Sequence, residues 1–296
     1  MEEINGLIAQ LWYTRDTRSS KPNPLDEVKS LIFYLDILYR NVYNDLISDP
    51  DIIKGSSNFN ISFGSWVGAD KDGNPFVTTK ITKEALKIYS NQIISIYKEK
   101  IIELSDDFSV STNFVYCPDL LERRIKNYSI LLKKEFDHYS KVNFDEPFRI
   151  FLSLVFHRLE NFQQNNKGYN SFNEFLEDME IFQNSVNEVF GKNFRISKLD
   201  DFVDYVKQFE FHGVALDIRQ NSSVINSKKG KIYKDFINLI KEIPELQNIY
   251  GQKVFNSIIL SMTKSHQDLL NLFNLCSSLI PDKNIPSLTP LIEEIE

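Results

Sequence analysis

The residue types best suited to chemistry in this chain gather between positions 65 and 75, which read Ser-Trp-Val-Gly-Ala-Asp-Lys-Asp-Gly-Asn-Pro. Gly68 and Gly73 allow backbone conformations that other residues avoid. Four neighbours offer charge and hydrogen-bonding groups on a tight turn: Asp70, Lys71, Asp72 and Asn74. The stretch follows a short apolar run and precedes a helical pattern, which is where α/β enzymes place ligand-binding loops. The alternative is a charged surface turn.

A second group of charged residues lies on a strand pattern. Val214, Leu216 and Ile218 alternate with Ala215, Asp217 and Arg219, so the two sets face opposite sides of a sheet. A guanidinium grips phosphate or carboxylate oxygens through two parallel hydrogen bonds, which makes Arg219 the strongest candidate for ligand binding. The alternative is an Asp217–Arg219 ion pair between neighbouring strands. Trp66 has two interpretations as well, because an indole can exclude water from a site or fill a core.

The sequence assigns no metal ligand and no acid–base residue. Asp70-x-Asp72-x-Asn74 resembles the start of a calcium loop, but the sixth position is Pro75 and the twelfth is Ile81, where an EF-hand needs Gly and Glu. The four histidines share no ligand spacing: His138, His157, His212 and His266. The two cysteines, Cys117 and Cys276, are far apart and are expected to be reduced.

The elements that must position these residues are mostly helical. Apolar periodicity predicts helices at about 4–13, 27–48, 82–104, 118–140, 146–164, 171–190, 197–209, 231–243 and 266–278, with strands at 61–63, 213–220, 257–262 and 285–292. Asp26 is the expected cap of the second helix, and His266 is a candidate cap for the last. Strands that alternate with helices imply a parallel sheet. The predicted fold is about half of a (β/α)8 barrel with four parallel strands and a large helical insertion; a doubly wound open sheet is the alternative.

This pattern divides the chain into four parts. They are a helical segment at 1–60, a strand with the Trp/Gly/Asp loop at 61–81, a helical insertion at 82–210 and a strand-helix-strand-helix-strand part at 211–296. The first helix begins almost at Met1, which suggests a cut through a larger structure.

Composition excludes several classes. A net charge of −7 argues against a nucleic-acid binder, since phosphate backbones require a concentrated positive face. No apolar run is long enough to span a membrane, and the acidic N-terminus lacks the features of a signal peptide. A cytoplasmic protein is expected.

Six motifs in order resemble phosphoenolpyruvate carboxylases across nearly the whole chain. The loop at 65–75 is similar to that family's S-W-M-G-G-D-R-D-G-N-P, and Leu216–Ser222 is similar to L-D-I-R-Q-E-S. The other four are Trp12–Glu27, Glu146–Arg149, Ser261–Lys264 with Asp268, and Pro290–Glu293. The family joins phosphoenolpyruvate and bicarbonate, with Mg or Mn, to give oxaloacetate and phosphate. Its members are usually cytosolic homotetramers built around a (β/α)8 barrel.

The resemblance implies that Arg219 holds the phosphate of phosphoenolpyruvate and that Trp66 lies on the bicarbonate side. Supporting residues would be Gly68, Asp70, Lys71, Asp72, Gly73, Asn74 and Asp217. The family's catalytic histidine segment is expected before Met1, and its metal-ligand and glycine-loop segments beyond Glu296. Catalytic residues and metal ligands would therefore lie outside this chain, which alone would be inactive.

Departures from the family pattern leave a second interpretation open. Ala69 stands for a glycine, Lys71 for an arginine, Asn221 for a glutamate and Glu294 for a threonine, while Arg15-Asp16 replaces an acidic pair. Lysine keeps the charge of arginine but loses its bidentate fork. The alternative function is a non-catalytic helical remnant or interaction scaffold from a degraded carboxylase gene.

Overall fold

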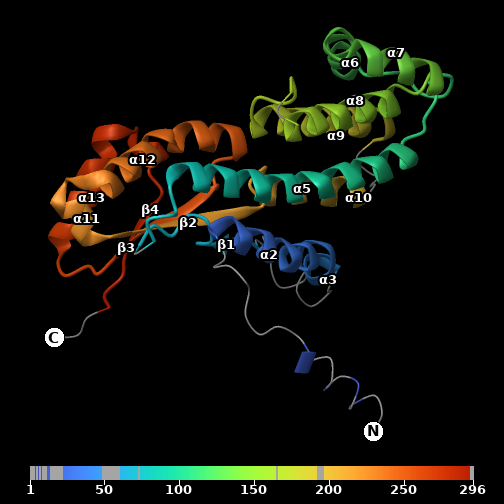
Figure 1. The fold of residues 1–296 in the computed structure, drawn as a ribbon. Helices are drawn as coiled ribbons and strands as arrows, with labels where there is room; N and C mark the ends of the chain where they lie inside the picture. The colour runs from blue at the N-terminus through green and yellow to red at the C-terminus, as the bar shows by residue number, and fades with distance from the viewer. Residues whose placement is uncertain are drawn as a thin grey trace.

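A four-stranded parallel sheet lies at one end of an elongated, mostly helical molecule (Figure 1). The computed structural model describes residues 4, 6, 8, 12–13, 23–48, 61–72, 74–164, 166–191 and 197–293. The strands are β1 (Phe63–Ser65), β2 (Val214–Asn221), β3 (Phe255–Ser261) and β4 (Ser287–Pro290), and they pair in that order. Every pairing is parallel, as the sequence predicts.

The two faces of the sheet differ in polarity. On β2, Val214, Leu216 and Ile218 are buried, whereas Asp217 and Arg219 are partly exposed. The register places Asp217 beside Ser257 on β3, and Ser257 beside Ser287 on β4. A polar row therefore crosses the sheet on the face opposite the packed one, in agreement with the predicted alternation.

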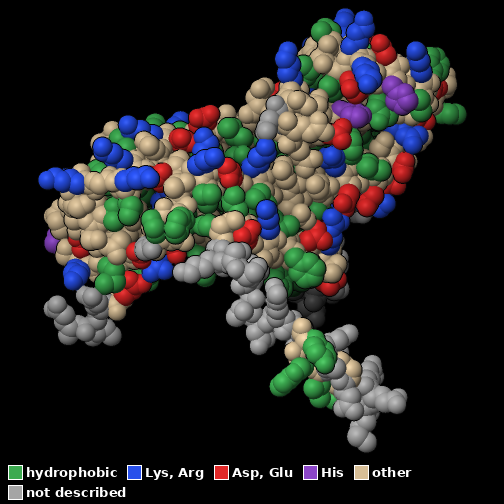
Figure 2. Space-filling view, viewed as in Figure 1, with side chains coloured by type: hydrophobic (Ala, Val, Ile, Leu, Met, Phe, Trp, Pro, Cys, Tyr) green, Lys and Arg blue, Asp and Glu red, His purple; other side chains and the backbone are tan. Residues whose placement is uncertain are grey.

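Helices before and between the strands account for most of the chain. The chain first forms α2 (Pro24–Ile37), a π-helical turn (Leu38–Val42) and α3 (Tyr43–Ser48). Between β1 and β2 come α5 (Thr79–Asp107), α6 (Asp119–Leu131), α7 (Lys133–Val142), α8 (Pro147–Gln163), α9 (Phe172–Phe190) and α10 (Ser197–Phe209). The remaining elements are α11 (Ser222–Ser227), α12 (Gly230–Tyr250), α13 (His266–Leu279) and a 3₁₀ turn (Asp282–Asn284). In Figure 1, α5 extends from the sheet past α8 and α9, and α6 and α7 lie at the far end. Figure 2 shows basic and acidic side chains spread together over this face of the molecule.

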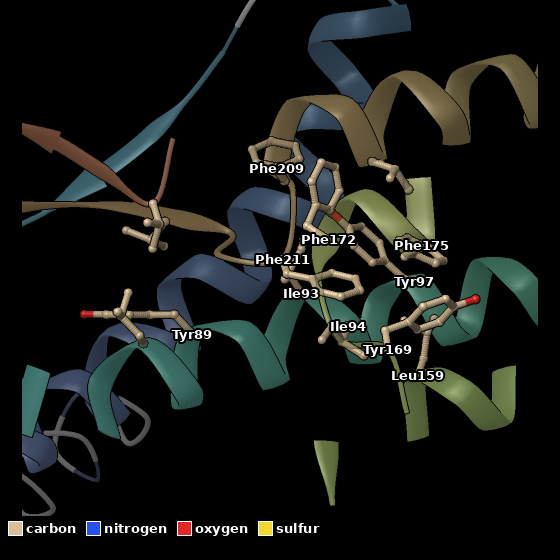
Figure 3. Packing of buried hydrophobic residues seen from close by; sticks show 14 of the residues in the cluster. Tyr89, Ile93, Ile94, Tyr97, Leu159, Tyr169, Phe172, Phe175, Phe209 and Phe211 are labelled. Carbon is tan, nitrogen blue, oxygen red and sulfur yellow. The ribbon is translucent and has the colours of Figure 1, made fainter. Parts of the chain in front are cut away.

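Aromatic side chains join the helical part to the sheet. Phe211, fully buried just before β2, lies with its ring centroid 5.3 Å from that of Phe175 and 4.9 Å from that of Phe162. Figure 3 shows Phe211 and Phe175 near Tyr97 and Ile93 of α5. The high aromatic content of the sequence is thus concentrated where long helices pack around the sheet.

A buried polar network stabilises the same region. Asp178 of α9 is fully buried and accepts hydrogen bonds from the hydroxyls of Tyr128 and Tyr169, both at 2.6 Å. Arg158 of α8 donates to the Tyr128 hydroxyl at 2.6 Å and to Glu174 at 2.6 Å. Burial raises the pKa of Asp178 to about 6, although the tyrosine hydrogen bonds oppose the shift.

Several predicted boundaries were wrong. The helix expected at 118–140 is two helices, because the buried Leu132 takes a non-helical conformation (φ −121°, ψ 51°). The helix expected to end at 243 continues through Pro244 to Tyr250. Leu246 and Gln247 are buried in this last part, and their burial stabilises it. The helix α11 was not predicted.

The predicted caps were also wrong. Asn23, not Asp26, caps α2, and Asp26 completes the capping box from its third position. Ser265, not His266, caps α13. Of the helix predicted at 4–13, Ile4, Gly6, Ile8, Trp12 and Tyr13 are described, and they are helical and exposed. The rest of that helix, and positions 14–22, lie outside the described residues.

Candidate functional site

The carboxyl ends of the four strands meet at one edge of the sheet, because all four run in the same direction. The loop of residues 66–78 follows β1, α11 follows β2, residues 262–265 follow β3 and residues 291–293 follow β4. Ligands bind at this edge in α/β proteins, since loops from separate strands converge there. We call this group of segments the carboxyl edge.

Arg219 is held at the carboxyl edge by its own backbone. Its amide donates to the carbonyl of Ala69 at 3.2 Å, and its carbonyl accepts from the amide of Lys71 at 2.9 Å. These two bonds flank Asp70, which forms an isolated parallel bridge with Arg219. The loop after β1 therefore returns to pair with the end of β2, and it fixes Arg219 more firmly than strand pairing alone would.

The guanidinium of Arg219 faces carboxylates from two segments. Nη2 lies 2.8 Å from Oε1 of Glu293 and 3.3 Å from Oδ2 of Asp72, and Nη1 lies 4.0 Å from Oδ2 of Asp70. The Nε atom is buried and has no hydrogen-bond partner among the described residues. The Arg219 side chain as a whole is 31% exposed.

The loop after β1 is stabilised by its own side chains. Oδ1 of Asp70 accepts from the amide of Asp72 at 3.0 Å, and Oδ1 of Asn74 accepts from the amide of Phe76 at 3.0 Å. Burial raises the pKa of Asp70, while the Asp72 amide and Arg219 oppose that shift. The side chains of Asp70 and Asn74 therefore hold the loop through hydrogen bonds within it. Gly73 lies outside the described residues.

Two features require a glycine at position 68: its backbone conformation and the close approach of a neighbouring side chain. Its φ is +93°, and a Cβ at this position would lie 2.5 Å from the Cβ of Ala85 on α5. Trp66, two residues earlier, is 62% exposed, so its interpretation as a core aromatic was wrong. Trp66 therefore lies exposed at the carboxyl edge.

Lys71 and Asp217 have partners that the sequence did not reveal. Lys71 is buried, and its ammonium contacts Asp235 of α12 at 2.8 Å. Asp217 accepts hydrogen bonds from Asn256 at 2.9 Å and Ser257 at 2.6 Å. The alternative of an Asp217–Arg219 ion pair does not hold among the described interactions, because Arg219 pairs with Glu293 and Asp72 instead.

Sequence analysis also missed the role of Glu293. Its second carboxylate oxygen accepts from the amide of Met262 at 3.2 Å, so Glu293 joins the ends of β2, β3 and β4. Met262 has a φ of 52°, which turns this amide toward the edge. Asn221 adds a hydrogen bond to Asp72 at 3.2 Å. The available signal was an acidic residue directly after the last predicted strand.

Within the described part of the chain, no group of three or more His, Cys, Asp or Glu side chains is arranged to hold a metal ion. Burial lowers the pKa of His212 to about 3, and its Nδ1 lies 2.7 Å from the carbonyl of Phe209. The described residues therefore do not form a metal centre. No helix of the described residues combines the length and hydropathy that crossing a membrane requires.

A mostly helical chain with a four-stranded parallel sheet, whose carboxyl edge presents an arginine among acidic loops, belongs to the class of α/β proteins. Residues 1–233 match the family described as "Phosphoenolpyruvate carboxylase". The chain belongs to the phosphoenolpyruvate carboxylase family.

Curated relatives are phosphoenolpyruvate carboxylases. The protein of Nostoc sp. is 30% identical over 254 residues, covering 78% of this chain and 24% of that protein. That of Synechococcus sp. is 23% identical over an alignment covering 100% of this chain and 35% of that protein. That of Aromatoleum aromaticum is 26% identical over 75% of this chain and 26% of its own length. The chain thus spans between 24% and 35% of the length of these relatives.

Proposed function

We propose that this chain forms one wall of the active site of a phosphoenolpyruvate carboxylase, which joins phosphoenolpyruvate and bicarbonate to give oxaloacetate and phosphate. The observation that supports this most directly is the guanidinium of Arg219, which binds the Glu293 carboxylate at 2.8 Å at the carboxyl edge. A guanidinium that holds one oxyanion has the donors to hold another, and its planar fork suits phosphate.

The two candidate binding residues have distinct roles in this proposal. Arg219 binds the phosphate of phosphoenolpyruvate. Trp66, exposed at the start of the same edge, lies on the bicarbonate side, where its indole keeps water from the reacting carbon. The supporting residues hold the loop and strand around them: Gly68, Asp70, Lys71, Asp72, Gly73, Asn74 and Asp217.

Acidic neighbours restrain the proposed phosphate site. Asp70, Asp72 and Glu293 all face the one guanidinium, so a phosphate must displace at least the Glu293 carboxylate. Glu293 therefore acts as an internal competitor for Arg219 when no ligand is bound. Glu293→Gln should strengthen binding of phosphoenolpyruvate measured without divalent cations, because removing one negative charge lowers the repulsion of the incoming anion.

The sheet supports a barrel arrangement in the complete enzyme. The order β1-β2-β3-β4 follows the chain without the reversal that defines a doubly wound sheet. In our proposal these strands are about half of a (β/α)8 barrel in a cytoplasmic homo-oligomer. Other segments supply the catalytic residues and the Mg or Mn ligands, so this chain alone does not carboxylate.

Calorimetric titration of the purified chain with phosphoenolpyruvate tests the phosphate site. Arg219→Gln should weaken binding by roughly tenfold to a hundredfold, the effect of losing a charge-assisted hydrogen-bonded pair of about 1.5–3 kcal/mol. Arg149→Gln is a matched control, because Arg149 on α8 is also 31% exposed and pairs with Asp106 away from the sheet.

Two results would contradict the proposal. Equal affinities for Arg219→Gln and Arg149→Gln would remove Arg219 from the site. Absence of binding in the unsubstituted chain would favour the non-catalytic scaffold instead. A coupled assay that detects oxaloacetate formed by this chain alone would disprove the requirement for further segments.

A further inference from the structure

The loop after β1 is anchored to a helix that comes more than 160 residues later. Lys71 Nζ lies 2.8 Å from Oδ2 of Asp235 on α12 and donates to the carbonyl of Val77 at 3.0 Å. The Lys71 side chain is 2% exposed and that of Asp235 is 28% exposed. A buried ammonium is stable only with a counter-charge, so Asp235 determines where Lys71 can lie.

The same carboxylate also holds the start of α5. The amide of Thr79 donates to Asp235 at 3.1 Å, and the Thr79 hydroxyl donates to the Asp235 carbonyl at 2.9 Å. Burial would raise the pKa of Asp235, but the bonds from Lys71 and Thr79 outweigh it and lower that pKa. Asp235 is thus kept ionised at the point where the loop, α5 and α12 meet.

Lys71 links Asp235 to Arg219, the proposed substrate-binding residue. Its side chain is fixed by Asp235, while its backbone amide donates to the carbonyl of Arg219 at 2.9 Å. The opposite bond of the same bridge runs from the Arg219 amide to the carbonyl of Ala69. Movement of Lys71 therefore displaces the backbone from which the Arg219 guanidinium extends.

We propose that Asp235 is a positioning residue for Arg219, acting through Lys71, and that it sets the affinity of the carboxyl edge for the phosphate of the substrate. The identity of the ligand rests on the proposed function, whereas the contact between Lys71 and Asp235 does not depend on it. Asp235 lies just beyond residues 1–233, which match the family model.

Hydrogen exchange of the full chain tests the anchor. Asp235→Asn keeps the shape of the side chain but leaves Lys71 without a counter-charge. The Arg219 and Lys71 amides should then exchange at least tenfold faster. Glu242→Gln is the matched control, since Glu242 also lies on α12 and pairs with Lys83 of α5 at 2.7 Å, away from the loop. Unchanged exchange at Arg219, or an equal rise in α8 and α9, would overturn the proposal.

A double substitution separates positioning from general destabilisation. Lys71→Met removes the buried charge and leaves an apolar side chain of similar length. In that background Asp235→Asn should add no further increase in Arg219 exchange. An additive effect would show that Asp235 acts without Lys71 and would contradict the proposed route. Asp235→Glu retains the negative charge, so the Arg219 amide should exchange more slowly in this variant than in Asp235→Asn.

Phosphoenolpyruvate titration of the same variants tests the consequence for binding. Asp235→Asn should weaken binding about tenfold, and Glu242→Gln should leave it unchanged. If the unsubstituted chain binds no phosphoenolpyruvate, the proposed function is wrong. The hydrogen-exchange result still shows whether Asp235 positions Arg219 through Lys71. If exchange at Arg219 rises and affinity stays the same, the anchor is present but does not set affinity, which refutes that part of the proposal.

Discussion

Gly68 provides a sharp test of how the loop after β1 is built, because two separate constraints act on it. Its φ of +93° disfavours any residue with a Cβ, and Ala85 of α5 occupies the space such a Cβ would take. Gly191, after α9, has a φ of +77° but no atom within 4 Å of the corresponding position. Gly68→Ala therefore meets both constraints and Gly191→Ala only the first.

The two constraints have different magnitudes. A backbone with a positive φ costs a non-glycine residue roughly 1–3 kcal/mol, and the stiffer unfolded chain returns about 0.4–1 kcal/mol. Gly191→Ala should thus lower the free energy of unfolding by about 1 kcal/mol. Forcing a methyl group against Ala85 adds roughly 1–3 kcal/mol, which brings Gly68→Ala to about 2–4 kcal/mol.

Urea unfolding with an unchanged m value measures these differences. Ala85→Gly removes the opposing methyl group, at a helix-propensity cost of about 1 kcal/mol. In that background Gly68→Ala should cost only the backbone part, about 1 kcal/mol. Equal destabilisation by Gly68→Ala and Gly191→Ala would refute the claim that α5 closes on the loop. So would a failure of Ala85→Gly to relieve Gly68→Ala.

Three further predictions concern the rest of the fold. Because burial raises the pKa of Asp178 from 3.8 to about 6, the folded chain holds this proton more tightly than the unfolded chain. The free energy of unfolding should fall as the pH rises through that interval, and Asp178→Asn should remove this component in pH-dependent urea titrations. Phe211→Ala should cost about 3–5 kcal/mol in the same assay, whereas Phe114→Ala, at a position 87% exposed, should change stability by less than about 0.5 kcal/mol. Among the described strands, β1 and β4 each have one unpaired side, so the isolated chain should self-associate in light scattering, and a monodisperse monomer would contradict this.

Local patterns predicted the elements well where periodicity was strong. The alternation from Val214 to Arg219 placed Arg219 on the polar face, and the structure confirms it. The long apolar stripe of α5 was equally informative. Errors arose where the local signal did not decide the outcome: Leu132 interrupts a continuous helical pattern with a non-helical backbone, and Pro244 does not end α12, in which buried residues follow it.

The contacts of the site were less predictable, because they join residues distant in sequence. The Lys71–Asp235 pair spans 164 positions, and Arg219 and Glu293 are 74 positions apart. No short motif encodes such partners. Of the two interpretations of Trp66 that the sequence left open, the structure removes the core aromatic, since the side chain is 62% exposed.

The length of α5 has a mechanical consequence. With 29 residues it is about 43 Å long, and it packs against α8 over part of this length and meets Asp235 at its first residue. A rod of this length that pivots by about 5° moves its far end by about 4 Å. The outlying helices and the loop that carries Trp66 and Lys71 are therefore attached to opposite ends of one lever. We therefore expect a displacement at one end of α5 to be transmitted to the other end.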